Sequence, residues 1–135
     1  MRFYIVGGKQ RRAAARSEEW HQYEKALVVE LDASTGRLET VLEHVTPDAA
    51  CPIDQDPGIV FKAATLVGGV LYACTQTEVM TYDVPSFRRR FYLSLPCFND
   101  VHHVSPTPEE TLFVASSRYH RDSTFAWAHR LAVVT

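Results

Sequence analysis

Short apolar runs separated by turn residues make up most of this chain. The clearest series lies in residues 61–95, where Gly68-Gly69 and Pro85-Ser86 interrupt runs rich in Val, Leu, Tyr and Phe. Runs of this length and composition, bounded by glycine or proline, predict β-strands joined by hairpins. We therefore expect one antiparallel sheet of four strands, over residues 61–67, 70–75, 78–84 and 87–95.

The N-terminal part of the chain predicts three further strands, over residues 3–6, 26–32 and 38–45. Ser34-Thr35-Gly36 separates the last two as a turn, because glycine tolerates the positive φ that such turns need. We interpret Gly7-Gly8 as the end of the first strand and as a hairpin turn. Residues 9–25 are rich in helix formers, so we expect there either a helical insertion or a loop.

A strand, a turn and a second strand recur near the C-terminus, with Leu112 standing 41 residues after Leu71. A period of about 40–45 residues is typical of a four-stranded propeller blade. We therefore expect an all-β, β-propeller-type domain or fragment with four-stranded antiparallel blades in an incomplete ring. Its units are a partial blade over 1–46, a full blade over 59–95 and a partial blade over 97–135.

The two partial units differ in what they lack. In the first unit, residues 3–6 take the place of a second strand, so the first strand is missing. In the third unit two strands are expected, and the pattern fades in residues 118–135. Closed propellers have about four to eight blades. Three units therefore predict either a piece of a larger propeller, or a homo-oligomer in which several chains close the ring, or an open stack.

Composition and charge narrow the class of function. A chain of 135 residues is one domain by size, and its net charge of −2 lacks the basic footprint of proteins that bind nucleic acid or anionic membranes. No apolar run approaches the ~20 residues of a membrane helix, and the apolar run in residues 1–6 is too short for the core of a signal peptide, so we expect a cytoplasmic protein. Cys51, Cys74 and Cys97 form no paired motif, which disfavours structural zinc. Cys74, within an apolar run, is expected to be buried.

The densest group of chemically active side chains is Asn99-Asp100-Val101-His102-His103, at the start of a predicted first strand. Strand alternation would place Asn99, Val101 and His103 on one side, and Asp100 and His102 on the other. We take Asn99 and Asp100 as candidate ligand-binding residues, and His102 and His103 as candidates for proton transfer. The alternatives are a turn cap formed by Asn99 and Asp100, and packing of one histidine within the blade.

Residues 98–106, continued by residues 112–116, resemble the Asn-Asp-Val…Asp-Pro…Gly-x-Leu-Tyr-Val stretch of gluconolactonase and senescence-marker-type propellers. Similar strings occur in NHL-like and other six-bladed propellers. In the gluconolactonase and senescence-marker family, the motif's asparagine binds a divalent cation in the central channel, usually calcium. The resemblance implies this metal-ligand role for Asn99 alone. Residues 105–110 replace the family's Asp-Pro-x-Gly turn, and calcium takes six to eight oxygen ligands.

Two classes of function follow. The first is a module that binds a small molecule or a protein partner through blade loops and the segment 9–25. The alternative is a divalent-metal-dependent, lactonase-like hydrolase, with Asn99 as one ligand of Ca²⁺ or another divalent cation and His102 or His103 transferring a proton. The binding module is favoured, because the family's remaining acidic ligands are not found in these 135 residues.

Overall fold

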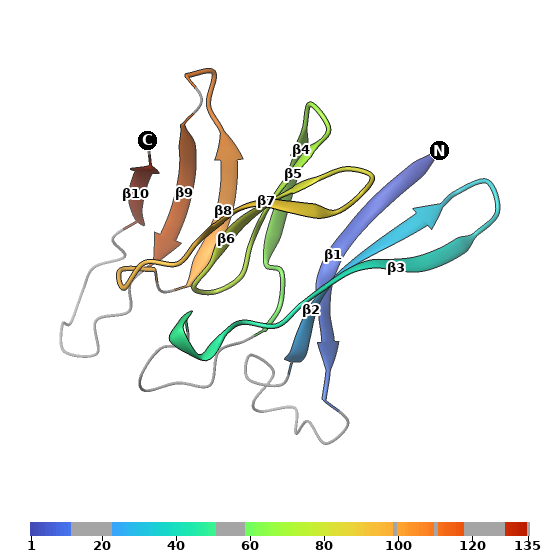
Figure 1. Cartoon of the computed structure of the whole chain (residues 1–135), viewed down its shortest axis with the longest axis horizontal. Coiled ribbons are helices and arrows are strands. Elements are labelled where there is room, and N and C mark those ends of the chain that lie inside the picture. Colours follow the sequence, from blue (N-terminus) through green and yellow to red (C-terminus); the bar gives the residue numbers. More distant parts are fainter. Residues whose placement is uncertain (12–22, 51–58, 99, 110, 118–128, 135) are drawn as a thin grey trace.

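A computed structural model describes residues 1–11, 23–50, 59–98, 100–109, 111–117 and 129–134. These residues form an all-β fold of three antiparallel sheets, with one turn of 3₁₀ helix at Asp48–Ala50 and no α-helix. The sheets follow one another across the molecule, and in each of them consecutive strands are neighbours (Figure 1). The expectation of an all-β fold is confirmed.

The three sheets contain three, four and three strands. The first sheet has the order β1 (Arg2–Gln10), β2 (Tyr23–Asp32) and β3 (Arg37–His44). The second sheet has the order β4 (Ala63–Val67), β5 (Val70–Cys74), β6 (Val79–Asp83) and β7 (Arg88–Leu93). The third sheet consists of β8 (Val101–Pro106), β9 (Leu112–Ser117) and β10 (His129–Val134), with β9 in the middle.

The hairpins of the first and second sheets lie where the turn residues predict them. Gly68 and Gly69, between β4 and β5, have φ of 56° and 77°, and Gly36, between β2 and β3, has φ of 72°. The segment 59–95 therefore contains the four-stranded sheet that its pattern indicates. In the third sheet the expectation of two strands is wrong, because β10 pairs with β9 from His129↔Ser117 to Val134↔Leu112.

The interpretation of Gly7-Gly8 as a turn is wrong, since β1 continues through both glycines to Gln10. Gly8 pairs with Ala26, and the ring of Tyr23 crosses over it. A Cβ on Gly8 would lie 2.8 Å from Tyr23 Cδ1, so glycine is what allows this close approach.

The interpretation of residues 9–25 as one insertion is also wrong at both of its ends. Lys9 and Gln10 belong to β1, and residues 23–25 belong to β2. Residues 12–22 lie outside the described part of the chain.

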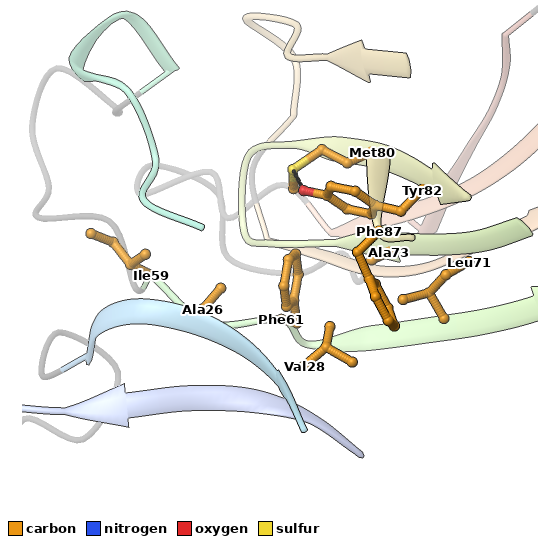
Figure 2. Packing of buried hydrophobic residues seen from close by; sticks show 9 residues of the cluster. All are labelled: Ala26, Val28, Ile59, Phe61, Leu71, Ala73, Met80, Tyr82 and Phe87. Carbon is orange, nitrogen blue, oxygen red and sulfur yellow. Dashed lines mark hydrogen bonds between the residues drawn. The ribbon is translucent and has the colours of Figure 1, made fainter. Parts of the chain in front are cut away.

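The first and second sheets pack face to face through a buried apolar cluster (Figure 2). Its members are Ala26, Val28, Ile59, Phe61, Leu71, Ala73, Met80, Tyr82 and Phe87. Burial raises the pKa of Tyr82 to about 12, and its hydroxyl donates a hydrogen bond to Met80 Sδ at 3.2 Å. Because both sheets supply residues to this cluster, the inner face of each sheet is buried only when the other sheet packs against it.

The second and third sheets share a separate buried cluster. It consists of Cys74, Val79, Phe98, Val101, Val104 and Val114. Cys74 is 0% exposed, which confirms that it is buried, and this burial raises the pKa of its thiol to about 11. The four-stranded sheet is therefore covered on both faces.

The outer hairpins of the first two sheets are built alike. Gly36 N–H donates to Asp32 O at 2.8 Å, and Phe87 N–H donates to Asp83 O at 2.6 Å. Both closing residues have positive φ, 72° at Gly36 and 51° at Phe87. The two turns place Asp32 and Asp83 at equivalent positions, so the residues before them, Leu31 and Tyr82, are also equivalent. Leu31 pairs with Phe3 on β1, and Tyr82 pairs with Leu71 on β5, so β1 is the equivalent of β5.

The middle strand of the third sheet follows the same pattern. On β5, Leu71 and Ala73 face the preceding sheet, and on β9, Leu112 and Val114 do so. Three tetrapeptides are thus equivalent: Phe3-Tyr4-Ile5-Val6, Leu71-Tyr72-Ala73-Cys74 and Leu112-Phe113-Val114-Ala115. The second residue of each is aromatic.

The two glycines of β1 give a direct test of the packing. We expect Gly8→Ala to lower the free energy of unfolding by about 1–3 kcal/mol, because the new methyl group overpacks against the Tyr23 ring. Gly7→Ala is the matched control, since no atom lies within 4 Å of the site of its Cβ. It should raise stability by about 0.5–1 kcal/mol. Urea denaturation checks both, and equal effects of the two substitutions would contradict the packing argument.

Candidate functional site

A cluster of charged side chains lies where the first strands of the second and third sheets begin. Lys62 directly precedes β4, and its ammonium group donates a hydrogen bond to Asp100 Oδ1, directly before β8. His102 Nε2, on β8, lies 3.2 Å from Asp100 Oδ2. The Lys62–Asp100–His102 cluster therefore joins residues from two sheets at one point.

β4 and β8, the first strands of these two sheets, lie side by side (Figure 1). Thr65 Oγ1 on β4 donates to Val104 O on β8 at 3.1 Å. At the first residue of β8, Val101 N–H donates to Gln76 O at 2.9 Å. These contacts set Asp100 opposite Lys62.

Asp100 has an unusual backbone conformation, with φ of 61°. Aspartate visits this left-handed region more readily than most side chains, but at a cost in free energy. Backbone strain of this kind concentrates at functional sites. The conformation and the charged contacts together single out Asp100 among the described residues near these strand starts.

The predicted alternation along residues 99–103 is confirmed in one part and wrong in another. Asp100 and His102 are on the same side, as expected, since their side chains meet. Val101 and His103 do not share a side, because Val101 is buried and His103 is exposed. A β-bulge causes this difference: Val101 pairs with Ser116 and His103 with Ala115, so His102 is an extra residue.

The bulge also determines that the side chains of both histidines are exposed. Val101 and Val104 both fill the core, and the side chains of His102 and His103 are both exposed. Packing of one histidine within the sheet is therefore not what occurs. Asn99, the candidate metal and ligand-binding residue, lies outside the described residues.

The described residues by themselves do not fit a calcium centre. Among them no group of three or more His, Cys, Asp or Glu side chains converges in a way that could hold a metal ion. Asp100 directs its carboxylate toward the Lys62 ammonium, whose positive charge opposes a cation there. Calcium needs six to eight oxygen ligands, which Asp100 alone does not supply.

A second polar cluster, which the sequence pattern did not reveal, surrounds the carboxylate of Glu78. This side chain is 0% exposed, and Glu78 directly precedes β6. Four side chains contact it: His44 Nε2 at 3.0 Å, Thr46 Oγ1 at 2.6 Å, Thr75 Oγ1 at 2.7 Å and Tyr92 OH at 2.9 Å. Because an ionised carboxylate only accepts hydrogen bonds, His44 donates from Nε2–H.

The Glu78 cluster ties the first sheet to the second. Burial by itself raises the pKa of Glu78, but the hydrogen bonds from His44, Thr46 and Thr75 outweigh it, so the pKa is lowered. His44 ends β3 and stacks against Phe61, with ring centroids 6.0 Å apart. Since the carboxylate has no exposed surface, we interpret this cluster as structural. No local signal identifies it, because His44 and Thr46 precede Glu78 by 34 and 32 residues.

Comparisons of the chain with protein-family models, curated proteins and solved structures found no match. Within the ranges that the structure describes, no helix has the length and apolar character needed to cross a membrane. The functional argument therefore rests on the geometry of the sheets and of the Lys62–Asp100–His102 cluster.

The Glu78 cluster predicts a specific loss of stability. We expect Glu78→Gln to cost on the order of 3 kcal/mol, because the amide leaves buried donors without their carboxylate. Glu39→Gln is the control, since Glu39 is exposed in its ion pair with Arg37. Urea denaturation at neutral pH distinguishes them, and a loss as small as that of the control would contradict a stabilising role.

The same cluster predicts a dependence on pH. The pKa of Glu78 is lower in the folded than in the unfolded protein, so its stabilisation is present above the unfolded pKa of about 4.3. It is lost as the pH falls through the lower, folded value. Between pH 6 and the acid range, the stability difference between the parent protein and Glu78→Gln should therefore shrink. A constant difference would contradict an ionised Glu78.

Proposed function

We propose that this chain is a ligand-binding module built from β-propeller-type blades. Its binding site lies where β4 and β8 begin. The observation that carries the proposal is the Lys62–Asp100–His102 cluster, which draws charged groups from two sheets to one partly exposed point. The equivalence of the three sheets and the adjacency of β4 and β8 support a blade arrangement, in which first strands gather around a common axis.

The side chains of the cluster suggest the chemistry of the ligand. The side chains of Asp100 and His102 are 37% and 44% exposed, so a ligand can reach both. Lys62 and His102 supply donors and Asp100 supplies acceptors, a combination that suits a small molecule carrying both carboxylate and hydroxyl groups. We therefore propose a small hydroxy acid as the class of ligand.

Nuclear magnetic resonance titration with malate tests this proposal. Backbone amide signals of residues 62 and 100–103 should shift, and His102→Ala should weaken binding about tenfold or more, because a hydrogen bond to a charged group contributes about 1.5–3 kcal/mol. Glu39→Ala, which removes an exposed ion pair on β3, is the control and should leave binding unchanged. Shifts confined to other residues, or none at millimolar malate, would refute the site.

A second candidate function is the lactonase-like hydrolase that the resemblance implies. The contact between Asp100 and His102 favours it, because a carboxylate that orients an imidazole prepares the ring to accept a proton from water. Lys62, less exposed than the other two, holds Asp100 in place from the neighbouring sheet. The described residues do not complete a calcium site, so this candidate ranks second.

Lactone hydrolysis in the presence of calcium separates the two candidates. For a hydrolase, His102→Ala should lower kcat about 10²–10⁴-fold, the range of general acid–base catalysis. His103→Ala, one residue beyond the bulge, is the comparison and should have a much smaller effect. Calorimetric calcium binding should be lost in Asn99→Ala. Absence of turnover, or calcium binding unchanged in Asn99→Ala, would eliminate the hydrolase and leave the binding module.

A further inference from the structure

The first sheet presents an apolar face that no described residue covers. Phe3, Ile5 and Leu38 are 43%, 49% and 62% exposed. Phe3 pairs with Leu31, and Leu31 pairs in turn with Leu38, so apolar residues of three strands adjoin on this face. Tyr4 and Val6, on the opposite face of β1, pack against the core shared with the second sheet. Contiguous apolar surface of this kind marks a protein interface.

The equivalence of the sheets shows what kind of surface fits this face. Phe3 and Ile5 occupy the positions of Leu71 and Ala73 on β5, which are 3% and 0% exposed. Leu71 and Ala73 are buried because the preceding sheet packs on them. The outward face of the first sheet is therefore an interface for a preceding sheet, which we name the leading face.

The third sheet carries the complementary half. Phe113 on β9 is 37% exposed and occupies the position of Tyr4 on β1 and Tyr72 on β5. Tyr4 and Tyr72 both pack toward the following sheet. Phe113 and its neighbour Ala115 therefore belong to a surface for a following sheet, which we name the trailing face.

The leading and trailing faces are the two halves of a contact that already occurs twice within the chain, between the first and second and between the second and third sheets. We propose that the leading face of one copy packs on the trailing face of a second copy, head to tail. Two copies bring together six sheets, within the range of about four to eight in closed propellers. When a head-to-tail arrangement closes into a ring, the leading face and the trailing face of every copy are both covered.

This self-association does not rest on the proposed ligand site. The Lys62–Asp100–His102 cluster lies at the junction of the second and third sheets, and the proposed contact uses the outward faces of the first and third. Loss of either property in a variant therefore leaves the other measurable.

Sedimentation equilibrium of the full chain tests the proposal. We expect a mass twice the 15.3 kDa of one chain. Ile5→Asp, on the leading face, and Phe113→Lys, on the trailing face, should each reduce the mass to that of one chain. Val67→Asp is the control, since Val67 is 48% exposed but lies beside the β4–β5 turn, away from both faces. This variant should remain a dimer.

Mixing the two variants tests the interface by the recovery of association instead of its loss. In a dimer of one Ile5→Asp chain and one Phe113→Lys chain, one interface is unaltered and the other sets aspartate against lysine. The mixture should therefore regain the dimer mass, and circular dichroism should show that both variants are folded. A monomeric parent protein, or association that survives both single substitutions, would overturn the proposal.

Discussion

Burial of both faces of the four-stranded sheet is the constraint on which the rest of this structure depends. Leu71, Ala73 and Met80 are covered by the first sheet, and Cys74 and Val79 by the third. A sheet with two apolar faces is stable in water only between two other layers. The two flanking sheets thus owe their positions to the middle one, and their strand starts are brought together as a consequence.

Polar contacts then select one arrangement of these layers, and their burial decides what each can do. Glu78 is buried between the first and second sheets, where it accepts hydrogen bonds from four side chains that hold the two layers together. Asp100 joins the second and third sheets in a similar way but remains partly exposed. A carboxylate with no exposed surface serves stability, whereas one that a ligand can reach is available for binding.

The repeated tetrapeptides connect this packing to assembly. The residues of β1, β5 and β9 alternate between a surface for the preceding sheet and a surface for the following one. Within the chain these surfaces meet twice, and at its two outermost sheets each occurs once with nothing described against it. The apolar alternation that builds the core is therefore also what exposes Phe3, Ile5 and Phe113.

The sequence by itself determined the strands and turns whose signals are local, such as Gly36 and the Gly68-Gly69 hairpin, because positive φ selects glycine wherever the partners lie. It also located Asp100 and His102 together. Only the tertiary structure decided the path of β1 through Gly7 and Gly8, the pairing of β10, the bulge at His102 and the partners of Glu78. Each of these depends on residues distant in sequence, whose approach is set by sheet packing and not by local pattern.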